Sequence, residues 1–233
     1  MKVKIKINNW GKYGIEFLSV FIAVISAFAL NNWNDNRKNH IAEEKILTEI
    51  YNGLQKDLVD LKANETGHKM GLYATVYFNN LLANNEVSKD SLLFHYYNLT
   101  RDFLSIQNTT GYEALKSKGL ELIENDSLRS EIISLYEYEY EILRKLEEQY
   151  YESQFQENYF KDINQLISRS FEIDNNKTII GINTPLNITE IEEKELLSYL
   201  WKIQQNRRFI LFYYPVIMNK IEKVINDIKK NGS

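Results

Sequence analysis

The residue types that most often carry catalysis or hold metals are few and scattered in this chain of 233 residues. The three histidines, His40, His68 and His95, are far apart, and none lies in an HExxH motif or a similar ligand spacing. The sequence has no nucleophile elbow, no phosphate-binding glycine loop and no cysteine. We therefore predict no catalytic, cofactor-binding or metal-binding residues, and a protein that is not an enzyme.

One acidic residue, Glu16, lies next to a segment in which a charged side chain is energetically unfavourable. Glu16 precedes the most apolar stretch of the chain, FLSVFIAVISAFAL from Phe17 to Leu30. An acid inside a membrane is a functional hypothesis by default, because burying its charge in lipid is unfavourable. Glu16 would then make the protein an accessory of an ion-driven envelope motor. Alternatively, Glu16 reaches water at the membrane interface or pairs with Lys12.

Tyrosine is abundant, with 16 residues, and several follow one another in a stretch with helical spacing. Tyrosine has a large apolar ring and a polar tip, so it suits both a protein core and a binding surface. Tyr136, Tyr140, Tyr150 and Tyr151 are therefore candidates for a surface that binds a partner helix. The alternative, which we favour, is that they are core and rim residues.

The apolar stretch itself indicates a membrane anchor. Its 14 uncharged residues are fewer than the roughly 20 of a usual spanning helix. Tyr13 and Trp33, however, lie about 30 Å apart along a helix, so that one aromatic side chain would stand at each edge of the hydrocarbon layer. Asn31 and Asn32 would mark the exit into the headgroups. We rank an uncleaved signal anchor over 13–33 first, a cleaved signal peptide second and a buried helix third.

The basic residues on each side of this segment give an orientation. Lys2, Lys4, Lys6 and Lys12 precede it, against three basic residues soon after it. Positive charge favours the cytoplasmic side. The expected organisation is a short basic cytoplasmic tail over 1–12, a transmembrane anchor over 13–33 and an extracytoplasmic domain over 34–233. The protein would be a single-pass protein of a bacterial inner membrane, in contact with lipid, with its C-terminal domain in the periplasm.

Composition limits the class of the external domain. Nine glycines and two prolines provide few turns, which disfavours β-sandwiches and barrels. A net charge of −4 with interspersed acids and bases gives no basic face, so nucleic acid is not an expected partner. We therefore predict an all-α protein, in which a single N-terminal transmembrane helix continues into an antiparallel bundle of long helices.

Apolar spacing and capping residues place the helices of the first half. The anchor should continue as a stalk to about Ala63, followed by a turn over 64–67 and a second helix over 70–82. Ser88 can cap a third helix that reaches Phe103. A short helix over 110–118 should end at Gly119.

In the second half, Asn125 or Asp126 can cap a helix that lacks Gly and Pro from 127 to about 170. Residues 171–188 resemble a loop with a short extended piece over 178–180. Thr189 and Glu192 form a capping box for the next helix. Residues 209–218, FILFYYPVIM, should form a core helix kinked by Pro215, and a final amphipathic helix should follow it.

Two stretches carry a resemblance to a known family. Glu16 and the run Asn31-Asn32-Trp33-Asn34-Asp35 resemble the N-terminal signature of a Bacteroidota membrane-protein family, catalogued as domain-of-unknown-function family 6090. Residues 110–129, with Tyr112-Glu113, Leu115-Lys116-Ser117 and Gly119, look like its middle motif. The chain has Ile15 where members usually carry glycine. The resemblance implies a membrane-anchored helical protein and supplies no mechanism.

These observations lead to one functional expectation and two alternatives. An anchor, long amphipathic helices and no catalytic signature favour a structural or interaction subunit of a membrane complex, which binds other membrane or periplasmic proteins or further copies of itself. A ligand-sensing periplasmic bundle that signals through a partner is the first alternative. The ion-driven motor accessory that uses Glu16 is the second.

Overall fold

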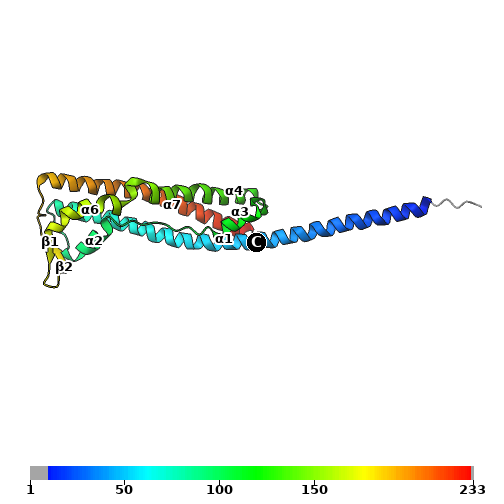
Figure 1. Ribbon diagram of the computed structural model, residues 1–233, viewed down its shortest axis with the longest axis horizontal. Helices are drawn as coiled ribbons and strands as arrows, with labels where there is room; N and C mark the ends of the chain where they lie inside the picture. The colour runs from blue at the N-terminus through cyan, green and yellow to red at the C-terminus, as the bar shows by residue number, and fades with distance from the viewer. Residues whose placement is uncertain (1–9, 232–233) are drawn as a thin grey trace, which may run out of the picture.

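The fold of residues 10–231 is described by a computed structural model, and it is an elongated helical structure (Figure 1). Its two dominant elements are the first and last helices, α1 (Trp10–Leu82) and α7 (Glu190–Asn231). The expectation of a helical protein that begins with a long apolar helix is confirmed. The basic tail predicted over 1–12 lies mostly outside the described residues.

Helix α1 is continuous over 73 residues. The turn predicted over 64–67, and with it a separate helix over 70–82, is wrong. Asn64 lies inside the helix and donates from its side-chain amide to the Asp60 carbonyl at 3.1 Å. Gly67 lies against the Phe103 ring, since a Cβ atom built on it would be 2.2 Å from that ring. Gly67 therefore allows the Phe103 ring to approach the helix closely, and the helix continues past this glycine.

Helices α2 (Leu92–Leu99) and α3 (Thr110–Lys118) lie along α1. A short 3₁₀ turn, η1 (Lys89–Ser91), precedes α2, and the Ser88 side chain does not cap it. Helix α2 ends four residues earlier than predicted. Helix α3 ends as predicted at Gly119, whose φ of 101° is one that glycine adopts easily. A second 3₁₀ turn, η2 (Leu120–Leu122), follows.

The helical stretch predicted from 127 to 170 is divided into pieces. Asn125 caps α4 (Asp126–Ser134), accepting from the backbone N–H groups of Ser127 and Leu128 at 3.1 Å each. Two π-helical turns, η3 (Leu135–Glu139) and η4 (Lys145–Gln149), surround α5 (Tyr140–Arg144). The chain leaves helical geometry at Tyr150 and continues through η5 (Tyr151–Ser153), α6 (Phe155–Ile167) and η6 (Ser168–Ser170).

A small hairpin connects this half to α7. Strands β1 (Phe171–Ile173) and β2 (Ile179–Ile182) pair antiparallel, which confirms the extended piece expected near 178–180. The Thr189 and Glu192 capping box is also confirmed, with Glu192 accepting from the Thr189 N–H at 2.8 Å. Helix α7 then runs through Pro215 to Asn231. The sequence predicted a helix from Thr189, a core helix over 209–218 and a final amphipathic helix. In the structure these three form one continuous helix.

Helices α1 and α7 lie side by side and run in opposite directions (Figure 1). Lys229 lies over the Tyr51 ring at one end of their contact, and Arg207 meets His68 further along. Between them and the α4 to α6 segment lies the apolar core. Fully buried members include Leu54, Phe78, Leu115, Ile132, Phe155, Leu200, Ile210 and Tyr214. Residues 13–41 of α1 extend beyond this core and are exposed.

Gly71 provides a test of how closely α7 approaches α1. A Cβ atom there would be 2.3 Å from the Arg207 Nε, and Arg207 is fully buried and cannot move aside. We expect Gly71→Ala to lower the free energy of unfolding by about 1–3 kcal/mol, although alanine is the better helix former by about 1 kcal/mol. Urea unfolding of the full chain in mild detergent, followed by circular dichroism, measures this loss.

Gly53→Ala is the matched control, because its nearest contact would be 3.2 Å from the Asn108 Cβ. We expect its free energy of unfolding to stay within about 1 kcal/mol of the wild-type value. Equal losses in the two variants would contradict the close approach at Gly71.

Candidate functional site

Arg207 is the most deeply buried charged residue of the bundle, with no exposed surface. Its guanidinium donates to the carbonyls of Leu99 and Arg101 at 3.0 and 2.9 Å and lies 4.1 Å from the centre of the Phe155 ring. The C-terminal end of a helix is a favourable place for a cation, because its last carbonyls have no partner in the helix. Burial lowers the pKa of Arg207 to about 9, which leaves it charged at neutral pH.

His68 of α1 lies against this guanidinium. The Arg207 Nη1 is 3.1 Å from His68 Nδ1, and since a guanidinium can only donate, Nδ1 accepts. Protonation of the ring would place a second positive charge there. Burial and, secondly, the charge of Arg207 lower the pKa of His68 to about 3. His68 is therefore a neutral core residue at physiological pH.

Four acidic side chains hold the connecting segment, the irregular stretch 100–109 between α2 and α3. Backbone N–H groups of this segment have no helical partner, so they need other acceptors. Asp57 accepts from the Asn108 N–H at 2.9 Å, Asp60 from the Ile106 N–H at 2.9 Å, and Glu147 from the Ser105 N–H at 2.7 Å. Asp102, itself in the segment, accepts from the Phe155 N–H at 2.7 Å at the start of α6. These acids serve the fold.

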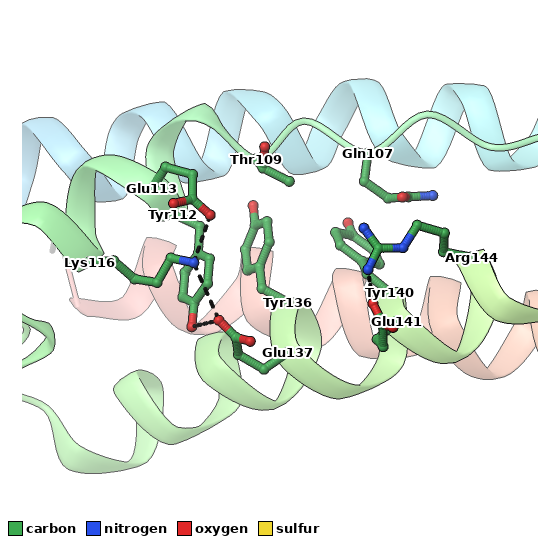
Figure 2. A pocket seen from close by; sticks show the side chains of 10 residues that line it. All are labelled: Gln107, Thr109, Tyr112, Glu113, Lys116, Tyr136, Glu137, Tyr140, Glu141 and Arg144. Carbon is green, nitrogen blue, oxygen red and sulfur yellow. Dashed lines mark hydrogen bonds and ion pairs between the residues drawn. The ribbon is translucent and has the colours of Figure 1, made fainter.

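A polar cleft of about 320 Å³ opens between α3 and the turns around α5 (Figure 2). Its wall contains the Tyr112 and Tyr136 rings, stacked 4.5 Å apart, and the Tyr136 and Tyr140 rings meet edge to face. Lys116 lies at one end, 2.7 Å from Glu113, and Arg144 at the other end pairs with Glu141. Both π-helical turns lie next to it, and such turns are frequent at functional sites. The remaining lining residues are Gln107, Thr109 and Glu137.

The four tyrosines named from the sequence fall into two groups. Tyr136 and Tyr140 are buried, and the Tyr140 hydroxyl donates to Asp57 at 2.7 Å. Burial and, secondly, the charge of Asp57 raise the pKa values of both. Both side chains are therefore packed in the core, where Tyr136 and Tyr140 also form part of the cleft wall. Tyr150 and Tyr151 are exposed.

The residues predicted to flank the membrane lie on the part of α1 that projects from the bundle. Tyr13, Glu16, Asn31, Asn32 and Trp33 are all exposed. The Asn31 amide donates to the Asp35 carboxylate at 3.1 Å, and the Arg37 guanidinium lies 5.9 Å from the centre of the Trp33 ring. Among the described residues, α1 is the one helix long and apolar enough to cross a membrane, with a mean hydropathy of 2.0 over its best window, none of it buried.

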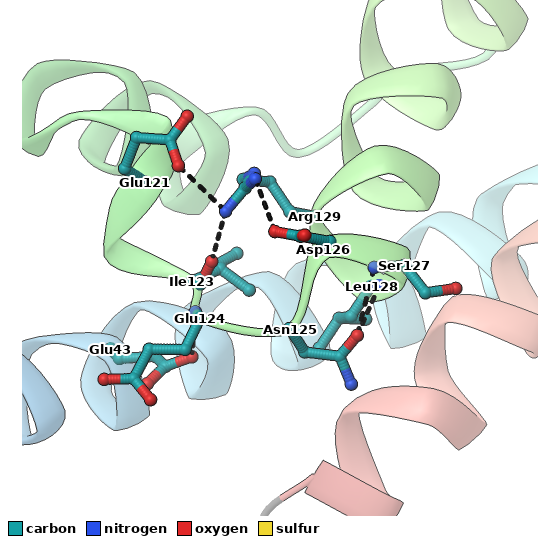
Figure 3. A network of polar contacts seen from close by, with 9 residues as sticks. All are labelled: Glu43, Glu121, Ile123, Glu124, Asn125, Asp126, Ser127, Leu128 and Arg129. Carbon is teal, nitrogen blue, oxygen red and sulfur yellow. Dashed lines mark hydrogen bonds and ion pairs between the residues drawn. The ribbon is translucent and has the colours of Figure 1, made fainter.

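The end of the bundle nearest the projecting part of α1 is closed by a polar network (Figure 3). Glu43 of α1 accepts from the Glu124 N–H at 3.2 Å. Arg129 donates to the Ile123 carbonyl at 2.9 Å and pairs with Asp126 at 2.6 Å. These contacts fix the turn before α4 against α1 at the place where α1 enters the bundle.

An exposed apolar surface runs along the middle of α7. We call Trp201, Phe209, Phe212 and Val216 the α7 stripe; Phe212 is the most exposed of them, at 69%. The opposite side of the helix, with Ile210, Tyr214 and Ile217, is buried. The sequence interpretation of 209–218 as a core helix therefore holds for one side of it, and the other side is exposed.

Sequence reasoning did not identify the buried polar residues Arg207, Glu147 and Asp57. In the sequence, such a residue can be recognised only as a charged side chain at a helix position where the amphipathic pattern expects an apolar one. These helices carry many charges, so a single charge at such a position is hard to distinguish. Within residues 10–231 no three acidic, histidine or cysteine side chains are grouped as a metal site would require.

The neutral state of His68 predicts a pH effect on stability. Its pKa of about 3 in the fold lies below the 6.5 of the unfolded chain, so the unfolded chain takes up a proton first as the pH falls. Stability from this group is complete above pH 6.5 and is lost between 6.5 and about 3, by at most about 1.4 kcal/mol per pH unit. His68→Gln, which keeps an acceptor for Arg207, should remove this part of the slope.

Urea unfolding of wild type and variant at several pH values from 4 to 7 measures the difference. His40→Gln, at an exposed position, is the control and should keep the wild-type slope. If the free energy of unfolding depends on pH equally in His68→Gln and in the wild type, the pKa of His68 is not lowered by burial as we expect.

Comparisons with known proteins agree with the resemblance noted in the sequence. A family model described as a family of unknown function, DUF6090, matches residues 16–191. That range includes the apolar part of α1, the connecting segment, the cleft and the hairpin, and it ends at the start of α7. Searches of curated proteins and of solved structures give no match. The chain belongs to the family DUF6090.

Proposed function

We propose that this protein is a single-pass envelope protein whose antiparallel helical bundle acts as a structural or interaction subunit of a membrane complex, without catalysis of its own. The anchor is residues 13–33, the N-terminus is cytoplasmic, and the bundle is periplasmic in a bacterial cell. The modest lysine bias before the anchor supports this orientation.

The continuity of α1 carries this proposal. One helix supplies both the exposed apolar segment and part of the bundle core, from Ile46 to Leu81. From Trp33 to Glu43 the helix rises about 15 Å, so the bundle would stand close to the membrane surface. A partner bound to the bundle would thereby be held at a fixed height. The α7 stripe offers a surface for such a partner, since exposed apolar patches mark interaction sites.

A double substitution tests the anchor. Phe21→Arg with Ile25→Arg places two charges in the apolar part of α1, at a cost of about 3 kcal/mol each for membrane insertion. We expect this variant to be lost from the membrane fraction after alkaline carbonate extraction. Val59→Arg with Val76→Arg, at exposed positions of the same helix inside the bundle, should stay with the membrane. Equal retention of both variants would argue against an anchor in this segment.

A second candidate function is a ligand-sensing bundle that signals through a partner. The cleft at Tyr136 favours it, because a sensor needs a polar pocket between helices, and 320 Å³ is in the range of small-molecule sites. Lys116 and Arg144 at its two ends could each release their acidic partner and bind an anionic group of a ligand.

A thermal-shift screen of the full chain in mild detergent with amino acids, sugars and carboxylates tests the cleft. For a compound that raises the melting temperature, Lys116→Ala should abolish the rise. Lys118→Ala should leave it intact, because Lys118 lies two residues further on α3 and does not line the cleft. If no compound in the screen shifts the melting temperature, or if both variants respond alike, the sensor hypothesis loses its support.

A further inference from the structure

A second pocket, separate from the cleft at Tyr136, lies between α2 and α6 at the end of the bundle opposite the projecting part of α1 (Figure 1). Its volume is about 500 Å³, which is in the range of small-molecule sites. Three aromatic and four polar side chains line it, and none of them lines the cleft. The lining residues are Tyr96, Tyr97, Thr100, Arg101, Asp102, Gln156 and Phe160.

The aromatic side chains form the apolar part of this pocket. The Tyr96 and Phe160 rings lie 6.3 Å apart, centre to centre. The Tyr96 hydroxyl donates to Asn164, and its ring meets the Phe171 ring edge to face, so this side chain is held from two sides. Tyr97, in contrast, is 65% exposed, and much of its side chain is open to contact. Such rings favour an aromatic group of a ligand.

Two hydrogen-bond donors of the pocket have no acceptor in the described part of the chain. Arg101 makes no ion pair there, and its guanidinium lies over the Tyr97 and Phe103 rings, 5.1 and 5.5 Å from their centres. The Gln156 side-chain oxygen accepts from the Thr100 hydroxyl at 3.0 Å, which orients the amide and leaves its NH₂ group unused by other described residues. A guanidinium and an amide NH₂ group together suit a carboxylate.

Asp102 supplies the opposite charge beside Arg101. One of its carboxylate oxygens accepts from the first two backbone N–H groups of α6, at 2.7 and 3.4 Å. The other oxygen has no hydrogen-bond partner among residues 10–231, so it can accept from an ammonium group. Arg207 and Glu157 act on Asp102 with opposite signs. The two cations and two acids of this region therefore balance, which suits a ligand without net charge.

We propose that this pocket binds a zwitterionic amino acid with an aromatic side chain. Arg101 and Gln156 bind its carboxylate, Asp102 binds its ammonium group, and its ring lies against the aromatic wall. The carboxylate and ammonium groups of an amino acid are attached to one carbon atom, and the cation and acid that match them here are neighbours in the chain. The inference goes beyond the proposed function, because neither the membrane complex nor the cleft requires this pocket.

Isothermal titration calorimetry of the full chain in mild detergent, with titration into detergent alone as the blank, tests the ligand chemistry. L-Phenylalanine carries both charges and a ring. Phenylpropionate lacks the ammonium group, phenylethylamine lacks the carboxylate, and L-alanine lacks the ring. We expect phenylalanine to bind, and the other three to bind at least about tenfold more weakly, because each leaves one part of the pocket without its partner.

Two variants locate the charged groups of the ligand. Arg101→Gln should weaken the binding of phenylalanine about tenfold or more and leave that of phenylethylamine unchanged, since the amine has no carboxylate to lose. Asp102→Asn, which keeps an acceptor for the start of α6, should weaken phenylalanine and leave phenylpropionate unchanged. Lys161→Gln is the control, because Lys161 is an exposed cation of α6 that does not line the pocket, and it should bind phenylalanine as the wild type does.

Three outcomes would overturn the proposal. These are no binding of phenylalanine at millimolar concentration, equal binding of phenylalanine and phenylpropionate, and equal binding of phenylalanine by Arg101→Gln and the wild type. Lys116→Ala should leave the binding of phenylalanine intact, and its loss in that variant would assign the ligand to the cleft instead of this pocket. The anchor and the interaction subunit are tested separately, since none of these measurements depends on them.

Discussion

The buried guanidinium of Arg207 is the contact on which the packing of the bundle depends. It reaches the carbonyls at the end of α2, the neutral ring of His68 on α1 and the Phe155 ring at the start of α6. A cation without exposed surface needs favourable neighbours, and here the two terminal nitrogens of the guanidinium donate to His68 and to backbone carbonyls, the Phe155 ring lies against it, and the Nε has no hydrogen-bond partner. That requirement fixes the position of α7 relative to three other elements, in a way that apolar contacts, which are not directional, cannot.

The same need for hydrogen-bond partners explains how a non-helical segment is tolerated between helices. The backbone N–H groups of Ser105, Ile106 and Asn108 have no helical partner, and the side chains of Glu147, Asp60 and Asp57 accept from them. Burial raises the pKa of Glu147, while the hydrogen bonds that it accepts from Tyr214 and Ser105 favour its charged form. Polar contacts therefore run through the largely apolar core. They connect α1 with α5 through Asp57 and Tyr140, and η4 with α7 through Glu147 and Tyr214.

This arrangement relates to function through rigidity. Helix α1 connects the exposed apolar segment to the core without interruption, and α7 is held against it by Arg207. The stripe on the outer side of α7 and the cleft beside α5 are consequently presented on fixed elements. In the proposed role, this arrangement would keep an external surface at a defined distance from a membrane.

Much of the architecture can be predicted from the sequence because it depends on local physics. Helical spacing, the cap at Asn125, the glycine end at Gly119 and the capping box at Thr189 are each decided by residues within a few positions of one another, and so is the apolar character of 17–30. The continuity of α1 through Gly67 and the division of the stretch 127–170 could not be predicted locally. Both depend on contacts between residues far apart in the chain, namely Gly67 with Phe103 and Glu147 with Ser105.

For the candidate surfaces, too, the local sequence decided one part and contacts between distant segments decided the other. The amphipathic pattern identified tyrosines at 136 and 140 as residues that suit either a core or a surface, and tertiary packing buried them against Asp57. It also identified 209–218 as apolar, but only the packing of α7 decided that Ile210 and Tyr214 face inward while Phe212 faces outward. By itself the sequence determined which residues are apolar and which segments are helical, because these follow from side-chain chemistry and local hydrogen bonding. Which apolar side chains remain exposed, and where a buried arginine finds its acceptors, was decided by tertiary structure, because both depend on which distant segments are neighbours.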